Sequence, residues 1–246
     1  MPSANQTPHP LRSGPNAAVD RTATANAPIN VAAADRAATD LAAGDVIGCW
    51  SPDSLGRLIT WATASPLGPA RLRLPPSHVA IIIEHDGEPM WVESTTLCPH
   101  TCTLTETRRR GVQMHPPGLR LEDYCRIGGR VERFMLAPIQ RFSDSESALL
   151  TQIVTRHLIG EARRYDLLGA ALSGWRLGRR LQRLIGADLD ALFCSELVAA
   201  LLMRVGRMNH ADPALFSPGR LLRQLVQTGV YRPAGSLICD HNVTAI

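Results

Sequence analysis

The feature that most constrains the fold is the strand-like segment from His78 to Glu84, whose five central residues are all apolar. A turn signal and a second apolar run follow it directly. A short run rich in Val and Ile is typical of a strand that is buried on both faces. The Asp86-Gly87 dipeptide favours a tight hairpin turn, and residues 90–94 then have the pattern of a returning strand. We therefore expect an antiparallel hairpin within a central sheet.

The remaining elements follow an order of strands first and helices second. Ser143 and Glu146 fit a capping box at the start of one helix, and Gly160 is a natural end for it. This order predicts an α+β fold. We expect a turn into a short buried strand over 43–50 and further strands at 118–124 and 131–137. The expected helices are 54–64, 143–160, 167–185, 194–205 and 218–227.

Length and composition predict one folded domain with a tail. The chain has 246 residues and is 45% hydrophobic, which suffices for one sizeable core. Residues 1–40 are rich in Ala, Pro, Asn, Thr and Asp and contain few large apolar side chains. Such a segment cannot bury enough surface to offset its ordering entropy. We expect a disordered tail over 1–40 and a domain over 41–246.

The charge pattern gives little reason to expect nucleic-acid binding. The net charge is only +4, and all the basic residues are arginine, which a GC-rich coding bias explains. Aromatic residues make up 4% of the chain, too few for base-stacking surfaces between basic groups.

The cysteines and the hydropathy together indicate a cytoplasmic protein. A chain of this length does not need disulfides, so a reducing compartment fits best. The first residues lack the pattern of a signal peptide, and no segment reaches transmembrane length. The basic amphipathic segment 175–185 allows peripheral membrane contact, although a surface helix is the favoured interpretation. The six cysteines are Cys49, Cys98, Cys102, Cys125, Cys194 and Cys239.

Cys194 is the candidate nucleophile, because it lies where an apolar, strand-like segment turns into an amphipathic helix. We expect it in the first helical turn, where free N–H groups and the helix dipole stabilise a thiolate. His78 supplies a base, and strand alternation places Glu93 on a face that the neighbouring strand shares with His78. Cysteine, histidine and carboxylate form a hydrolase constellation.

Each of these residues also has an ordinary structural interpretation. Cys194 can be a small buried apolar residue, and His78 can be a strand-edge histidine that bonds to backbone. Glu93 can be a solvated charge at the end of a strand. Glu84 and Asp86 compete with Glu93 for the role of orienting the imidazole, but they lie closer to the turn.

A metal site is a weaker possibility in the segment Cys98-Pro99-His100-Thr101-Cys102. Its residue types suit zinc, but structural zinc usually takes four ligands and no second Cys/His pair follows at matching spacing. His115 and Cys125 are only loosely placed. We therefore expect an ordinary loop, with no metal and no organic cofactor.

Several short motifs occur together in a fairly specific order, and this order resembles the YaeF/YiiX-like permuted branch of the NlpC-type papain-fold superfamily. The similarity covers about residues 41–225 and includes a cysteine that follows the histidine, whereas papain-like chains have the opposite order. The motifs are Gly44-Asp45-Val46-Ile47, Ser77-His78-Val79-Ala80-Ile81, Val92-Glu93-Ser94, Tyr165-Asp166, Phe193-Cys194-Ser195-Glu196-Leu197-Val198 and Ser217-Pro218.

The resemblance implies a circularly permuted papain-like fold, in which an antiparallel sheet carries His78 and Glu93 and packs against a helix that carries Cys194. It also implies their roles, with Cys194 as nucleophile, His78 as general base and then acid, and Glu93 as the residue that orients the imidazole. Tyr165 and Ser195 are candidates for substrate binding or for the oxyanion site. The backbone N–H of Cys194 is a further oxyanion candidate.

The function implied by the resemblance is a cysteine hydrolase that cleaves an amide bond in a small peptide, a cell-wall peptide or an N-acyl amino acid. Two alternatives stay open. One is an acyltransferase or lipid esterase that uses the same acyl-cysteine, and the other is a non-catalytic binding module with a papain-like pocket. The sequence does not indicate an oligomeric state.

Overall fold

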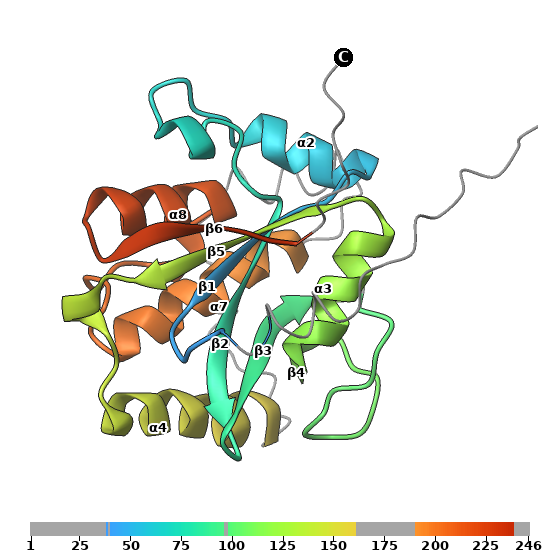
Figure 1. Ribbon diagram of the computed structural model, residues 1–246, viewed down its shortest axis with the longest axis vertical. Helices are drawn as coiled ribbons and strands as arrows, with labels where there is room; N and C mark the ends of the chain where they lie inside the picture. Colours follow the sequence, from blue (N-terminus) through green and yellow to red (C-terminus); the bar gives the residue numbers. More distant parts are fainter. Residues whose placement is uncertain (1–37, 39, 96–97, 161–189, 239–246) are drawn as a thin grey trace, which may run out of the picture.

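A six-stranded antiparallel sheet forms the centre of the protein in the computed structural model, which describes residues 38, 40–95, 98–160 and 190–238 (Figure 1). The spatial order of the strands is β4-β3-β2-β1-β5-β6. This part of the chain is therefore α+β, as predicted. The strands are β1 (Val46–Trp50), β2 (His78–His85), β3 (Glu88–Thr95), β4 (Gly111–His115), β5 (Arg130–Leu136) and β6 (Tyr231–Ile238).

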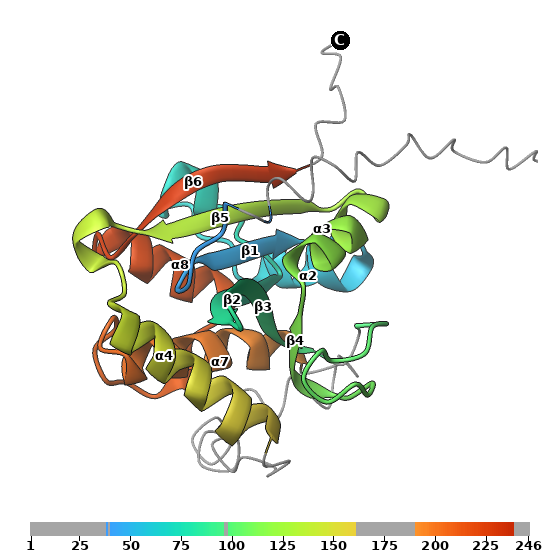
Figure 2. The same cartoon turned by 60° about the horizontal axis from the view of Figure 1, so that its bottom comes forward.

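Helices cover both faces of the sheet, with α4, α7 and α8 on one face and α3 on the other (Figures 1 and 2). The larger apolar core lies under α4, α7 and α8, and a smaller core lies under α3. The α-helices in the described part are α2 (Ser54–Ala62), α3 (Pro117–Arg126), α4 (Asp144–Gln152), which continues as the π-helix η3 (Ile153–Gly160), α7 (Asp190–Arg204) and α8 (Pro218–Gln227). Short 3₁₀ turns are η1 (Ala70–Leu72), η2 (Pro138–Gln140) and η4 (Pro213–Leu215).

The predicted hairpin is confirmed as β2 and β3. Ile81 pairs with Val92, and the turn residues Asp86 and Gly87 have φ angles of 54° and 80°. Positive φ at both central residues is what a tight primed hairpin turn requires.

Strand β2 contributes side chains to both cores. Val79, Ile81 and Ile83 lie in the larger core, whereas Ala80 and Ile82 lie in the smaller one. Each buried isoleucine stabilises the fold by roughly 1.5–3 kcal/mol. Side chains alternate between the faces of a strand, so His78 belongs to the face that α3 covers.

Strand β3 follows the same rule. Val92 lies in the larger core and Trp91 in the smaller core, which places Glu93 on the α3 face together with His78. The first strand, the helix near residue 54, the capping box at Ser143 and the end of that helix at Gly160 are also confirmed.

Two predictions about elements were wrong. Residues 118–124 belong to helix α3, which starts with Pro117 at its first position and buries Leu121, Tyr124 and Cys125 at helical spacing. Helix α7 begins at Asp190, so the segment before Cys194 is helical rather than strand-like. Strands β4 and β6 were not predicted at all.

The domain boundary at residue 41 and the disordered tail over 1–40 stay predictions. Leu41, where we expected the folded domain to begin, is buried in the smaller core. The tail up to residue 37, the expected helix 167–185 with its basic segment 175–185, and Tyr165 lie outside the described residues.

The cysteines differ from the expectation of free thiols. Cys125 is disulfide-bonded, whereas Cys49, Cys98, Cys102 and Cys194 are free. The reducing compartment and the cytoplasmic location stay predictions.

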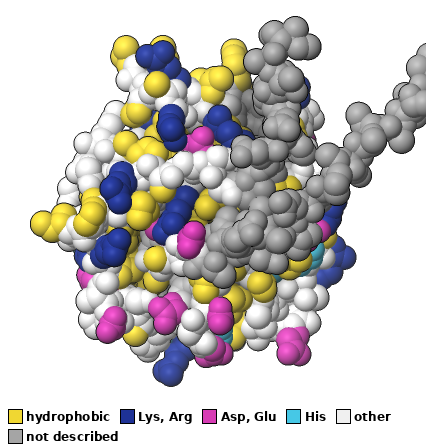
Figure 3. Space-filling view, viewed as in Figure 1, with side chains coloured by type: hydrophobic (Ala, Val, Ile, Leu, Met, Phe, Trp, Pro, Cys, Tyr) yellow, Lys and Arg dark blue, Asp and Glu magenta, His cyan; other side chains and the backbone are white. Residues whose placement is uncertain are grey.

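The surface gives two further observations. No helix in the described ranges is both long and apolar enough to cross a membrane. On the face shown in Figure 3, arginine side chains and acidic side chains both occur among the described residues, and neither sign of charge covers that face alone.

Candidate active site

Glu93 is the residue around which the candidate site is arranged. Its side chain is fully buried, and its Oε2 lies 2.8 Å from Nε2 of His78. Its other oxygen, Oε1, accepts a hydrogen bond of 2.7 Å from Nε of Arg120 on α3. Burying an unpaired carboxylate is very costly, so these two partners are what allow a charged group at this position.

His78 connects Glu93 to Cys194. Besides its contact with Glu93, the imidazole interacts with Cys194 through a side-chain hydrogen bond. The predicted contact between His78 and Glu93 is thus confirmed, and the structure brings all three predicted triad residues together. The side chain of His78 is 13% exposed, whereas Glu93 and Cys194 are fully buried.

The charges of this network follow from burial and from neighbouring groups. Burial would raise the pKa of Glu93, but the Arg120 cation and then His78 hold it well below its usual range. Burial would lower the pKa of His78, but its interactions with Cys194 and with Glu93 raise it to about 10. The imidazole is therefore positively charged at neutral pH and lies between the sulfur of Cys194 and the carboxylate of Glu93.

A second layer of charged residues holds Arg120 in place. The Arg120 guanidinium also donates to Asp123 one helical turn further along α3, and Asp123 lies 2.8 Å from Nε2 of His100. The guanidinium lies over the ring of Tyr124 at 5.6 Å. Through Arg120, helix α3 thus holds Oε1 of Glu93, the carboxylate oxygen that does not contact His78.

The position of Cys194 corrects one part of the sequence argument. Cys194 is the fifth residue of α7 and not part of its first turn. Regular helical bonding directs its backbone N–H to the carbonyl of residue 190, so this N–H is not a free oxyanion donor. The interaction with His78, rather than the helix end, is the feature that distinguishes this cysteine.

Ser195 forms a hydrogen bond within the fold. Its buried hydroxyl donates a 2.6 Å hydrogen bond to the carbonyl of Phe216, which ties α7 to the segment after η4. This geometry gives no support to the predicted substrate or oxyanion role of its hydroxyl. Tyr165, the other predicted residue of this kind, is outside the described ranges.

The competing acids lie elsewhere. Asp86 lies 3.6 Å from Nε2 of His85 at the hairpin turn. Glu84 lines a surface pocket with Thr151 and Arg156, six residues along β2 from His78. At about 3.3 Å per residue this pocket is about 20 Å from the triad along the strand, so it does not serve the triad.

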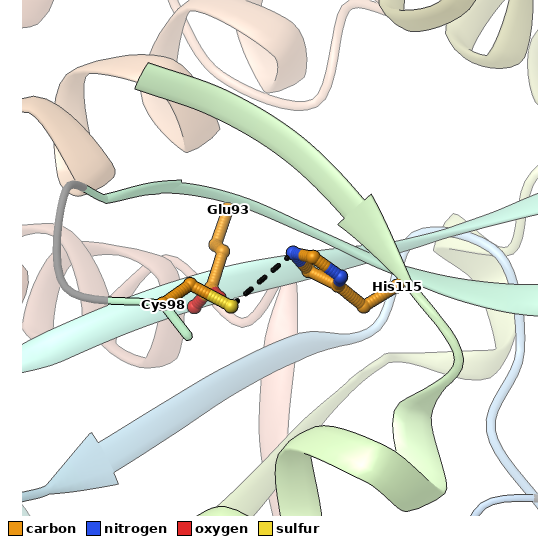
Figure 4. Close-up of side chains that lie close together, drawn as sticks. All are labelled: Glu93, Cys98 and His115. Carbon is orange, nitrogen blue, oxygen red and sulfur yellow. Dashed lines mark hydrogen bonds between the residues drawn. The ribbon is translucent and has the colours of Figure 1, made fainter. Parts of the chain in front are cut away.

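A second thiol–imidazole pair lies beside Glu93, and the sequence argument missed it. Cys98 Sγ is 3.4 Å from Nε2 of His115, and both atoms lie within 4.8 Å of the Glu93 carboxylate. Figure 4 shows the three side chains pointing toward one another from β3, from β4 and from the loop between these strands. Cys98 and His115 are buried, with exposed fractions of 8% and 0%.

The segment from Cys98 to Cys102 does not act as one ligand set. His100 pairs with Asp123, and Cys102 bridges to Thr107. His115 comes close to Cys98 because it pairs with Trp91 in the register of β4 on β3. The spacing of Cys98 and His115 along the chain could not reveal that they are in contact. Had β4 been recognised as a strand, the alternation of its side chains would have placed His115 and Gln113 on the same face of the sheet as Glu93.

Comparisons with known proteins leave the family open. No protein-family model matches the chain, and no curated protein matches its sequence. The family resemblance therefore stays a prediction.

Proposed function

We propose that the protein is a cysteine hydrolase that cleaves an amide bond in a small peptide, a cell-wall peptide or an N-acyl amino acid. The observation that carries this proposal is the chain of contacts from Cys194 through His78 to Glu93. Such a series is the arrangement by which enzymes activate a thiol and hold the imidazole in one orientation. A circularly permuted papain-like fold belongs to the same proposal, since His78 precedes Cys194 in the sequence.

The proposed reaction uses these residues in two steps. His78 holds the proton of the Cys194 thiol while Sγ attacks the carbonyl carbon, and it gives that proton to the nitrogen as the C–N bond breaks and the amine leaves. Water then attacks the thioester while His78 takes a proton from it, which releases the acid and restores the thiol pair. Glu93 accepts from the imidazole in both steps and does not itself change charge.

The residues around Glu93 support this division of roles. Arg120 keeps the carboxylate charged and leaves its Oε2 for His78. An orienting residue needs such support, because loss of imidazole alignment lowers catalysis strongly. The same acyl-cysteine chemistry would also serve an acyltransferase, which differs in the group that accepts the acyl chain, or a lipid esterase, which differs in the bond that is cleaved.

The test is selective alkylation. The protein is treated at pH 7 with a small excess of iodoacetamide, and the modification of each free cysteine is followed by mass spectrometry over time. Cys49 is the matched internal control, because it is as buried as Cys194 and burial raises its pKa well above the usual range. We expect Cys194 to react at least about tenfold faster than Cys49.

Two variants show whether fast alkylation of Cys194 comes from activation by His78 or only from access of the reagent to the thiol. His78→Ala should reduce the rate at Cys194 to that of Cys49, whereas His85→Ala, which removes a histidine at the other end of β2, should leave it unchanged. Labelling of Cys194 no faster than that of Cys49 in the parent protein would overturn the proposal. The binding-module interpretation would then be preferred.

A further inference from the structure

We propose that Cys98, His115, Glu93 and Gln113 form a binding site for a zinc ion beside the triad. Thiolate sulfur, imidazole nitrogen and carboxylate oxygen are the three donor types that zinc takes in proteins. The first three residues already place one such atom each within 4.8 Å of one another. They come from a loop and two strands, so the fold and not a local sequence motif brings them together.

The distances suit a tetrahedral ion. Bonds of about 2.3 Å to sulfur and about 2.05 Å to nitrogen imply a sulfur–nitrogen separation of about 3.6 Å at the tetrahedral angle. The separation of Cys98 Sγ and His115 Nε2 is 3.4 Å. The carboxylate oxygen of Glu93 lies within 4.8 Å of both atoms, and it would approach by up to about 1.4 Å to complete three sides of such a site.

The fourth ligand in this proposal is the neutral amide oxygen of Gln113, which joins the three more usual donors. Its Oε1 lies 3.2 Å from Nε2 of His115, close to the separation of about 3.4 Å expected for nitrogen and oxygen on one zinc ion. Its amide nitrogen donates to the carbonyls of Thr95 and Arg109, both at 2.7 Å. These two bonds hold the amide so that the oxygen faces the site, and Gln113 stands directly opposite Glu93 in the sheet.

His115 can become a metal ligand without breaking a contact of its other nitrogen. Its Nδ1 is buried and makes no hydrogen bond of good geometry in the described part of the chain, and the backbone of Thr101 lies beside the ring. The ring proton can therefore move to Nδ1 and free the lone pair of Nε2. Cys98 is the most exposed of the three clustered residues, so its side of the cluster is where an ion would arrive.

The nearby cations do not prevent binding. A carboxylate has about four acceptor positions, and Glu93 uses one on Oε2 toward His78 and one on Oε1 toward Arg120. The thiolate of Cys98 and the carboxylate would neutralise the two charges of zinc. Asp123 already balances Arg120 through a direct ion pair.

The site would couple zinc to the triad, and this part rests on the proposed function. A zinc ion on Glu93 withdraws charge from the carboxylate that orients His78. Zinc should therefore slow the alkylation of Cys194 by at least about tenfold when the site is filled.

Cobalt and zinc provide the direct test of the site. The metal-free full-length protein is titrated with Co²⁺, whose tetrahedral thiolate complexes absorb in the visible and near ultraviolet, and Zn²⁺ is then added in competition. We expect one ion per chain. Cys98→Ser and His115→Gln should each weaken binding by more than the roughly 10–100-fold that the loss of a supporting residue costs.

Two controls keep the result clear. Cys102→Ser removes another buried free thiol of the same loop and should bind the ion normally. Cys194→Ser should also bind normally, because Cys194 is not a ligand, whether or not the protein is a hydrolase. Circular dichroism checks that each variant is folded.

The proposal is overturned if the parent protein binds no cobalt or zinc. It is also overturned if binding survives in both Cys98→Ser and His115→Gln but is lost in Cys194→Ser, since the ion would then occupy the Cys194–His78 pair. Binding that depends on Cys98 together with an unreactive Cys194 would confirm the zinc site and reject the hydrolase.

Discussion

Removal of the Arg120 cation should cost more stability than any surface ion pair on the same helix. In Arg120→Met the carboxylate of Glu93 stays fully buried and loses its 2.7 Å partner. Breaking a buried ion pair by removing one partner typically costs about 3–5 kcal/mol. Glu93 keeps His78 and Asp123 keeps His100, each at 2.8 Å, so we expect the lower end of this range, about 3 kcal/mol.

The matched control is Arg126→Met, which removes an arginine from the same helix and is measured in the same assay. Arg126 is 53% exposed and pairs with Glu122 at 2.9 Å near the end of α3. Exposed pairs of this kind contribute about 0–1 kcal/mol, and we expect a loss within that range. The free energy of unfolding is measured by urea titration with circular dichroism, in the presence of a chelator so that bound metal does not contribute.

A double-mutant cycle isolates the pair itself. Glu93→Gln alone leaves the buried Arg120 with Asp123 as its remaining charged partner, whereas Glu93→Gln combined with Arg120→Met removes both charges of the Glu93–Arg120 pair. The combined loss should be smaller than the sum of the single losses by about 2 kcal/mol. A loss below about 1 kcal/mol for Arg120→Met, or losses that simply add, would refute the argument that α3 holds Glu93 charged.

Three further predictions concern other parts of the fold, each measured by urea unfolding. Burial and then Asp212 raise the pKa of Glu196 to about 7, so its charge destabilises the fold increasingly as pH rises from 4.5 through 7. Glu196→Gln should therefore stabilise the protein at pH 8 by about 1–2 kcal/mol, a value that is discounted for solvent screening. The same substitution should change the stability little at pH 4.5, and equal effects at both pH values would contradict this prediction. Ser143→Ala removes the capping box of α4 and should cost about 1 kcal/mol, whereas no loss would mean that the cap is dispensable. Gly44→Ala should lower the free energy of unfolding by about 2 kcal/mol or more, because φ is +89° and a Cβ would lie 2.7 Å from the side chains of Leu136 and Phe142. A neutral result would show that both side chains can move aside.

The central hairpin could be predicted because its signals are local. Consecutive Val and Ile residues, a turn dipeptide with positive φ and a second apolar run all lie within 20 residues or so of one another. Period-two alternation then placed Glu93 and His78 on one face without any knowledge of the rest of the fold. The 2.8 Å contact between His78 and Glu93 confirms that side-chain alternation along the two strands was enough to predict their shared face.

Helix α3 was missed because two leucines in it, Leu119 and Leu121, are two residues apart and imitate a strand. The helical signal was present, since Pro117 suits a first helical position and Leu121, Tyr124 and Cys125 follow helical spacing. The error had a consequence for the site. A strand would have left Arg120 without a defined neighbour, and its pairing with Glu93 could not be inferred.

The pair formed by Cys98 and His115 depends on information that no local pattern contains. Strand β4 has five residues, and its buried positions include the polar Gln113 and His115. Polar residues at buried positions weaken the hydrophobic signal of a strand. Only the register of β4 against β3 brings His115 to the face of Glu93, and register is a long-range property of the sheet.

Glu93 gives the reason why these residues lie together. A carboxylate without solvent stays charged only where cations and hydrogen-bond donors surround it, and the sheet alone offers His78 as such a partner. Helix α3 adds Arg120, which in turn requires Asp123, so the helix and the buried acid stabilise one another. Because the imidazole and the Cys98–His115 pair both approach the same carboxylate, a change in either one must alter the other through Glu93. This shared residue makes reactivity at Cys194 and metal binding at Cys98 two measurements of one network.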